Sequence, residues 1–120
     1  MEFSQQLAKL DRAVALERLG GDEQLLQEVA RLFLDEYPSL MSDIEAAKDS
    51  RNAKLLERAA HSLKGSVANF GADQAVEASL RLEKMGRGGN LQGVDEAYEI
   101  LNSVMKGIHH ELEDLAGEFA

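Results

Sequence analysis

The last quarter of the chain carries a regular pattern of apolar residues, and this pattern restricts the fold more than any other feature. Over residues 91–119 the apolar side chains recur at alternating spacings of three and four, as on one face of a helix that packs along its whole length. They are Leu91, Val94, Tyr98, Leu101, Met105, Ile108, Leu112, Leu115 and Phe119. We expect a long amphipathic helix with Asn90 as its N-cap, weakened internally by Gly93, Gly107 and Gly117.

Two helical segments are predicted in the first part of the chain. A short helix covers residues 11–19 and ends at Gly20-Gly21, because glycine accepts the left-handed conformation that closes a helix. Asp22 is a suitable N-cap for a second, longer helix with apolar residues at helical spacing. Pro38 lies within that pattern. Since proline lacks a backbone N–H and clashes with the preceding turn, we expect a kink or a break near Tyr37.

Two more helices complete the pattern in the middle of the chain. One runs from about residue 52 to about residue 69, and the next begins at Ala72. The inner face of the latter carries small residues that allow close packing on its neighbour: Ala75, Val76, Ser79 and Leu82. Its end is predicted at the glycines Gly86, Gly88 and Gly89. Four amphipathic helices with short connections indicate an all-α, antiparallel four-helix bundle, with the short N-terminal helix across one end and a single domain over residues 1–120.

Composition limits the setting in which this chain works. Hydrophobic residues make up 44% of its 120 residues, cysteine is absent, and the net charge is −9. An acidic chain is repelled by nucleic acid and by anionic lipid, so neither is an expected partner. No apolar run reaches the ~18 residues of a membrane span, and no signal-peptide pattern opens the sequence. We expect a cytoplasmic monomer.

His61 occupies an unusual place in the helix predicted over residues 52–69. At 100° per residue, it lies roughly 170° from the centre of the apolar stripe, so its ring is expected to face water. Lys64 and Gly65 follow at i+3 and i+4, where they neighbour the ring on the helix surface. A neutral imidazole has a lone pair free for attack near neutral pH, and the glycine leaves room for an approaching group.

The segment around His61 is basic although the whole chain is acidic. Residues 51–70 contain four cations and one anion, a local net charge of +3. This is either a chance feature of a solvated face or an attraction for an acidic pocket on a partner protein.

The sequence His61-Ser62-Leu63-Lys64-Gly65, followed by Gly71-Ala72, resembles the signature of histidine-containing phosphotransfer domains. The resemblance extends over most of the chain, including Gly20-Gly21-Asp22, Phe33-Leu34, Pro38 and Leu82-Glu83. It implies a helical bundle whose histidine carries a phosphoryl group between receiver-domain aspartates, without catalytic activity of its own.

The resemblance also implies roles for single residues. His61 would be the phosphoacceptor, Lys64 would steady the phosphoryl oxygens, and Gly65 would leave room for the receiver's active site. Glu83 takes the place of a polar residue, often glutamine, that holds the imidazole through its other nitrogen. Arg87, one turn further on, would offset the charge of that carboxylate.

The implied partners are a response-regulator receiver domain and a sensor or hybrid histidine kinase. They would dock on the His61 face, where the expected contact residues are Lys54, Glu57, Arg58, Ala68 and Arg87. The resemblance implies no cofactor on this chain, because the Mg²⁺ ion would belong to the receiver. It leaves open whether the chain is a whole protein or part of a longer one.

Two other functions remain possible at this stage. The chain is also consistent with the phosphoacceptor domain of a chemotaxis-type kinase, which shares the histidine-to-glycine spacing but is phosphorylated from ATP by a separate catalytic domain. The second is a helical adaptor in which His61 has no chemical role. A dimerising kinase hairpin is disfavoured, because Ser62 replaces the acidic residue that usually follows its histidine.

Other candidate sites in the sequence are weak. His109 and His110 with Glu113 offer at most a partial metal site, because adjacent histidines rarely face one ion and no third partner is evident. We expect no bound metal. Ser62 has no sequence partners for a nucleophilic triad, and the glycine-rich stretch 86–89 lacks the lysine-serine pair of a phosphate loop.

Overall fold

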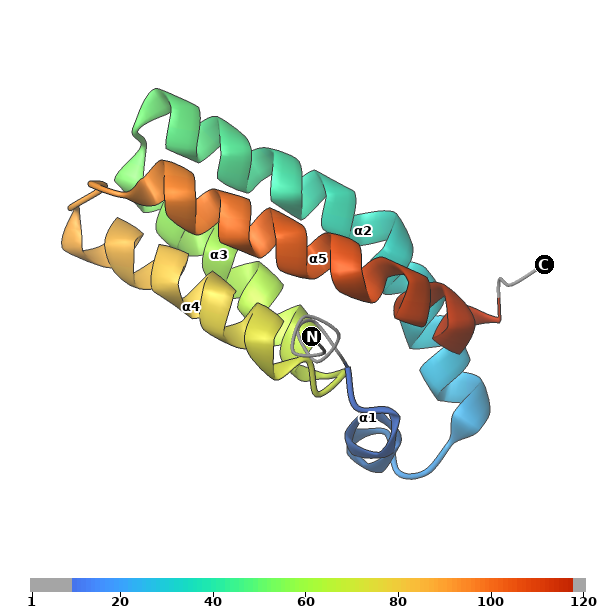
Figure 1. Cartoon of the computed structure of the whole chain (residues 1–120). Coiled ribbons are helices and arrows are strands. Elements are labelled where there is room, and N and C mark those ends of the chain that lie inside the picture. Colours follow the sequence, from blue (N-terminus) through green and yellow to red (C-terminus); the bar gives the residue numbers. More distant parts are fainter. Residues whose placement is uncertain (1–9, 118–120) are drawn as a thin grey trace, which may run out of the picture.

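Five helices and the turns between them account for residues 10–117, the part of the chain that the structure, a computed structural model, describes. They are α1 (Arg12–Arg18), α2 (Glu23–Ser50), α3 (Ala53–Ala68), α4 (Asp73–Gly88) and α5 (Val94–Ala116). Helices α2 to α5 form an antiparallel bundle in which α2 and α4 each pack against both α3 and α5 (Figure 1). The predicted all-α bundle is confirmed.

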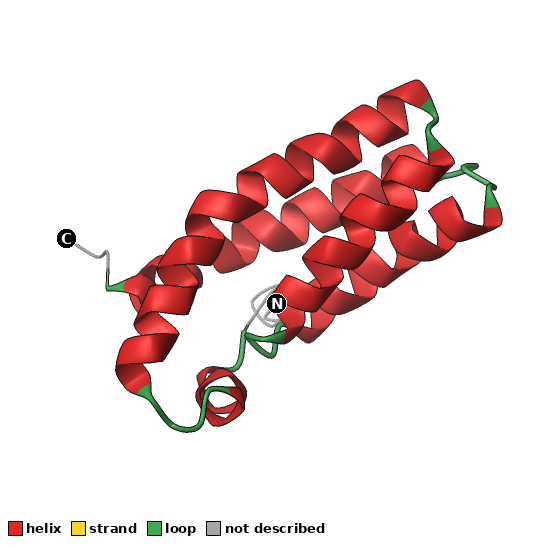
Figure 2. Cartoon of the chain, turned by 180° about the vertical axis from the view of Figure 1, so that it is seen from behind, coloured by secondary structure: helices red, strands yellow, loops and turns green. Residues whose placement is uncertain are grey.

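Helix α1 lies across the end of the bundle, with its axis turned away from those of the other helices (Figures 1 and 2). The backbone N–H of Asp11 donates to the carbonyl of Phe70 at 2.9 Å, and that of Leu10 donates to Glu111 Oε1 at 3.0 Å. Gly71 adopts φ +63°, and a Cβ there would lie 2.8 Å from the side chain of Asp11. These contacts fasten α1 to the α3–α4 turn and to α5.

Polar N-caps begin three of the helices. Side-chain oxygens of Asp11, Asp22 and Asn52 each accept a hydrogen bond from the backbone N–H three residues later, at 3.2, 3.0 and 3.1 Å. Each bond satisfies a donor that has no partner inside its helix. The sequence therefore places the starts of α1, α2 and α3 correctly.

Helix α2 continues through Pro38 without a break. The expectation of a break is therefore wrong, although the ribbon of α2 changes direction in its N-terminal half (Figures 1 and 2). Proline removes one intrahelical hydrogen bond. The buried side chains of Phe33 and Met41, on either side of it, anchor both halves of the helix to the same core.

The connection between α4 and α5 differs from the prediction. Gly86 lies inside α4, which continues to Gly88. Asn90 does not cap α5: its side chain accepts from the N–H of Gln92, and Gly93 at φ +85° is the residue that precedes the helix. The pattern of apolar residues begins one turn before α5 because Leu91, although outside the helix, still packs against the core.

The core lies between the four long helices. Alanines and other small side chains bring α3 and α4 together, and leucine, isoleucine and methionine fill the bundle. From the predicted seam of α5, five residues are fully buried: Val94, Leu101, Met105, Ile108 and Leu112. Tyr98 is nearly so, Leu115 is partly buried, and Phe119 lies outside the described residues. Within residues 10–117, no helix combines the length and apolar character needed to cross a membrane.

Candidate functional site

His61 lies midway along α3 with its ring in solvent. Its side chain is 66% exposed, whereas Ala60 and Leu63 beside it in the sequence are fully buried. The ring thus faces the side that the helical spacing predicts. An exposed imidazole can rotate freely unless a hydrogen-bond partner fixes the orientation of its ring.

A buried carboxylate from α4 holds the ring. Oε2 of Glu83 lies 2.9 Å from Nδ1 of His61, and the Glu83 side chain is only 3% exposed. The same carboxylate carries two cations, with Lys64 Nζ 2.7 Å from Oε1 and Arg87 Nη2 2.7 Å from Oε2. Arg87 also donates through Nε to Glu57 Oε2 at 3.2 Å. Glu57 and His61 on α3 are therefore tied, one turn apart, to Arg87 and Glu83 on α4.

These contacts decide the charge of Glu83. Burial by itself raises its pKa, but the hydrogen bonds from Lys64 and His61 outweigh burial, and the pKa lies below its ordinary value. Glu83 is therefore ionised near neutral pH and can only accept hydrogen bonds. It follows that Nδ1 of His61 carries the proton and donates it, and that the lone pair of the neutral ring is on Nε2, the nitrogen that Glu83 does not hold.

The close approach of α4 to α3 depends on Gly86, where the sequence predicts a helix end. A Cβ at this position would lie 2.6 Å from the backbone oxygen of Ala53 and 2.6 Å from the backbone nitrogen of Glu57. Any side chain would push the helices apart and carry Glu83 away from His61. The sequence does show a glycine within otherwise helical spacing. The pattern of one helix, however, does not reveal which neighbouring helix that glycine contacts.

An open groove of about 560 Å³ runs beside the ring. Its lining contains most of the predicted site and contact residues, together with Ser62, for which the sequence predicts no role: Lys54, Glu57, Arg58, His61, Ser62, Glu83 and Arg87. Lys54 and Arg58 are exposed on α3, on the N-terminal side of His61. Ala68 is half-buried and does not line this groove, but it lies two turns after His61 on α3 and therefore on the same face of that helix.

Gly65 leaves an open surface next to His61. A Cβ built on this glycine would meet no atom within 4 Å. Packing within the chain therefore does not require glycine here, in contrast to Gly86. The absent side chain leaves space on the outside of α3, one turn from the exposed ring.

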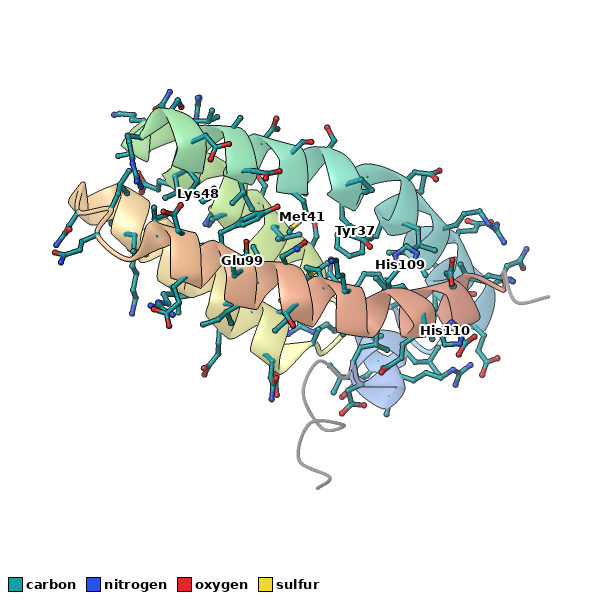
Figure 3. The ribbon with its side chains drawn as sticks, turned by 45° about the horizontal axis from the view of Figure 1, so that its top comes forward. Tyr37, Met41, Lys48, Glu99, His109 and His110 are labelled. Atoms are coloured by element: carbon teal, nitrogen blue, oxygen red, sulfur yellow. The ribbon has the colours of Figure 1, made fainter. Side chains whose placement is uncertain are left out.

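The other two histidines lie on α5 (Figure 3). The Tyr37 hydroxyl of α2 and Nδ1 of His109 form a hydrogen bond, and His109 Nε2 lies 3.3 Å from Glu113. His110 is largely exposed, with Nδ1 3.6 Å from Glu113. Burial and the nearby Glu113 raise the pKa of Tyr37. Within residues 10–117 no three histidine or carboxylate side chains are grouped to hold a metal ion.

Comparison with known proteins points to one family. The Hpt domain model matches residues 28–118. The phosphorelay protein LuxU of Vibrio harveyi is 31% identical over 61 residues, which cover 51% of this chain and 54% of LuxU, so the match spans about half of that relative. LuxU of Vibrio cholerae serotype O1 (strain ATCC 39315 / El Tor Inaba N16961) is 24% identical over 93 residues, covering 78% of this chain and 82% of the relative.

No solved structure matches the chain significantly. The family match covers three of the long helices and most of α2, including both the exposed histidine and the carboxylate that holds it. A helical bundle of this order with a solvent-facing histidine on α3 agrees with that match. The chain belongs to the Hpt domain family.

Proposed function

We propose that this chain is a histidine phosphotransfer protein that carries a phosphoryl group on Nε2 of His61 between the aspartates of receiver domains. The observation that carries the proposal is the exposed imidazole whose Nδ1 is held 2.9 Å from the buried Glu83 carboxylate. The family match and the likeness to two phosphorelay proteins support it.

Phosphoryl transfer to His61 requires mainly that the imidazole be correctly positioned. The Nε2 lone pair attacks the phosphorus of an aspartyl phosphate, the N–P bond forms, and the P–O bond breaks with its electron pair on the aspartate. A ring already oriented by Glu83 avoids the entropy cost of finding this geometry. The chain is proposed to act without catalytic activity or cofactor of its own, since the Mg²⁺ ion and acidic cluster belong to the receiver.

Lys64 and Gly65 have separate roles in this proposal. Lys64 neutralises Glu83 in the unphosphorylated protein, where its ammonium is 2.7 Å from the carboxylate. To steady phosphoryl oxygens, as the family resemblance implies, it must share its donors with the incoming group. Gly65 leaves the space that the receiver's active site needs beside His61.

The partner surface in this proposal is the groove face of α3 and α4. Lys54 and Arg58 supply attraction for an acidic receiver active site, while Glu57 and Arg87 form the rim that links the two helices. Ala68 lies two turns further along the same face of α3. The partners are a response-regulator receiver domain and a sensor or hybrid histidine kinase. We further propose a monomer that works in the cytoplasm, where ATP supplies the phosphoryl groups.

Transfer of labelled phosphate tests the proposal. Phosphorylated receiver domains are mixed with wild type and with His61→Gln, and the label on this chain is followed. We expect wild type alone to acquire a label that is lost in acid and stable in base, the behaviour of a phosphohistidine. Label that persists on His61→Gln would place the phosphoacceptor elsewhere.

The same assay separates the two alternative functions. A chemotaxis-type phosphoacceptor domain would be labelled by a chemotaxis-type kinase core with ATP and not by a phosphorylated receiver. A helical adaptor would be labelled by neither, and His61→Gln would bind its partners and give the same output as wild type.

A further inference from the structure

The group that holds Nδ1 of His61 is a carboxylate and not a neutral amide, and this difference matters most after phosphorylation. Glu83 Oε2 contacts Nδ1, while Lys64 and Arg87 bind the same carboxylate from the other directions. Among residues 10–117, the charged side chains that contact Glu83 all come from α3 and α4. The two cations keep the carboxylate ionised, and the carboxylate contacts the imidazole directly.

Phosphorylation turns the neutral ring into a cation. When Nε2 donates its lone pair to phosphorus, the ring retains the proton on Nδ1 and becomes a phosphoimidazolium. When the phosphoryl group leaves, the N–P electron pair returns to Nε2 and a neutral imidazole is released. If the Nδ1 proton were lost first, the leaving group would be an imidazolate anion, which leaves far more slowly. The lifetime of the phosphohistidine thus depends on the Nδ1 proton.

We propose that Glu83 shortens the lifetime of phospho-His61, because its carboxylate keeps the proton on Nδ1 and so holds the phosphorylated ring in its reactive, cationic form. This inference rests on the proposed function of His61. Glu83 does not touch the phosphoryl group, so it is a positioning residue that acts through the ring. A carboxylate beside an imidazole stabilises the imidazolium in the same way in serine-protease triads.

The surrounding charges set the size of the effect. An isolated carboxylate near a titrating group changes its protonation equilibrium by about ten- to a thousandfold. Here the positive charges of Lys64 and Arg87 cancel much of the electric field of Glu83. The carboxylate still accepts a charge-assisted hydrogen bond from the ring, whereas an amide in its place would accept a neutral one. We expect that difference to change the lifetime by about fivefold.

The test measures how fast the label is lost from phospho-His61 as pH changes. Wild type, Glu83→Gln and the control Glu77→Gln are phosphorylated with phosphoramidate, a small donor that needs no partner protein, and transferred to buffers from pH 5 to pH 9. Glu77 is an exposed glutamate on the same helix, so its variant makes the same chemical change away from the ring.

We expect equal half-lives at pH 5, where the ring is protonated in all three proteins. Near pH 8 the label on Glu83→Gln should last about five times longer than on wild type and Glu77→Gln, because an amide holds the cationic ring less strongly. Equal half-lives of wild type and Glu83→Gln at every pH, or a shorter half-life of the variant near pH 8, would overturn the proposal.

A measurement on wild type alone covers the case in which Glu83→Gln does not fold. The pH at which label loss slows is compared between the folded phosphoprotein and the same phosphoprotein unfolded in urea, where no carboxylate holds Nδ1. We expect the slowing at a higher pH in the folded protein, and the same pH in both would contradict the proposal. If wild type takes no label on His61, the proposed function fails and this inference fails with it, whereas label with an unaltered pH dependence refutes the role of Glu83 alone.

Discussion

A Cβ atom on Gly86 would lie 2.6 Å from the backbone nitrogen of Glu57. This contact and the equally close one to the backbone oxygen of Ala53 set how closely α4 approaches α3, and therefore whether the Glu83 carboxylate reaches the ring of His61. A residue with no side chain of its own thus controls the geometry of a site in which it makes no polar contact.

We expect Gly86→Ala to destabilise the protein. The added methyl group overlaps backbone atoms of α3, which cannot rotate away as a side chain can, so the free energy of unfolding should fall by about 1–3 kcal/mol. Urea denaturation measures the change. Gly88→Ala is the matched control, because a Cβ there meets nothing within 4 Å. A Gly86→Ala protein as stable as Gly88→Ala would show that the helices separate without cost.

Gly65→Ala should have opposite effects on stability and on function. Its Cβ has free space and alanine favours a helix more than glycine, so the free energy of unfolding should rise by up to about 1 kcal/mol. The same methyl group occupies the space beside His61, and the rate of transfer from a phosphorylated receiver should fall by about tenfold. Urea denaturation and labelled-phosphate transfer measure the two effects. An unchanged transfer rate would remove Gly65 from the docking surface.

Glu83 should contribute to stability above about pH 4.5, the ordinary value of a glutamate, and lose that contribution below it. Its pKa is lowered in the folded protein, so between the two values the unfolded chain binds the proton more readily and acid favours unfolding. In Glu83→Gln the free energy of unfolding should fall less steeply as pH drops below about 4.5. Urea denaturation at a series of pH values, with Glu77→Gln as control, tests this. Parallel slopes for wild type and Glu83→Gln would contradict it.

Neutralising Lys54 and Arg58 should slow association with a receiver domain at low salt. Both side chains are exposed beside the His61 groove, and attraction between unlike charges raises association rates until salt screens it. We expect Lys54→Ala/Arg58→Ala to associate about three- to tenfold more slowly at low ionic strength and at the wild-type rate in high salt. Stopped-flow binding provides the rates. Lys106→Ala, on α5, is the control, and an equal loss in that variant would mean that only net charge matters.

The sequence predicts the helices well where the signal is local. Asp22 is predicted as an N-cap, and Asp11 and Asn52 stand where the other two helices are predicted to begin; each of the three bonds to its own helix, three residues away. The solvent-facing side of α3 follows from the spacing of its apolar residues in the same way. Such features depend on neighbours in the chain and need no knowledge of the tertiary fold.

The failed predictions at Gly86 and Pro38 depend on packing between helices, whereas the one at Asn90 concerns a local turn. Glycine is weakly helical, so the sequence alone predicts a helix end at Gly86, and only the position of α3 shows why a side chain is absent there. Asn90 has the chemistry of a cap but closes a turn with Gln92, while Gly93 supplies the left-handed residue before α5. At Pro38, burial on both sides of the residue outweighs its local preference. The pairing of Lys64 with Glu83 likewise depends on how two helices face each other.

The division of the Glu83 oxygens has a consequence for any variant that lacks the histidine. With the imidazole gone, the buried carboxylate still keeps both cations, Lys64 on Oε1 and Arg87 on Oε2, so no uncompensated charge is left inside the bundle. A single base change that replaces His61 could therefore yield a folded protein that binds receiver domains but transfers no phosphoryl group to them. Such a protein would act as a dominant inhibitor of the phosphorelay in which the wild-type protein works.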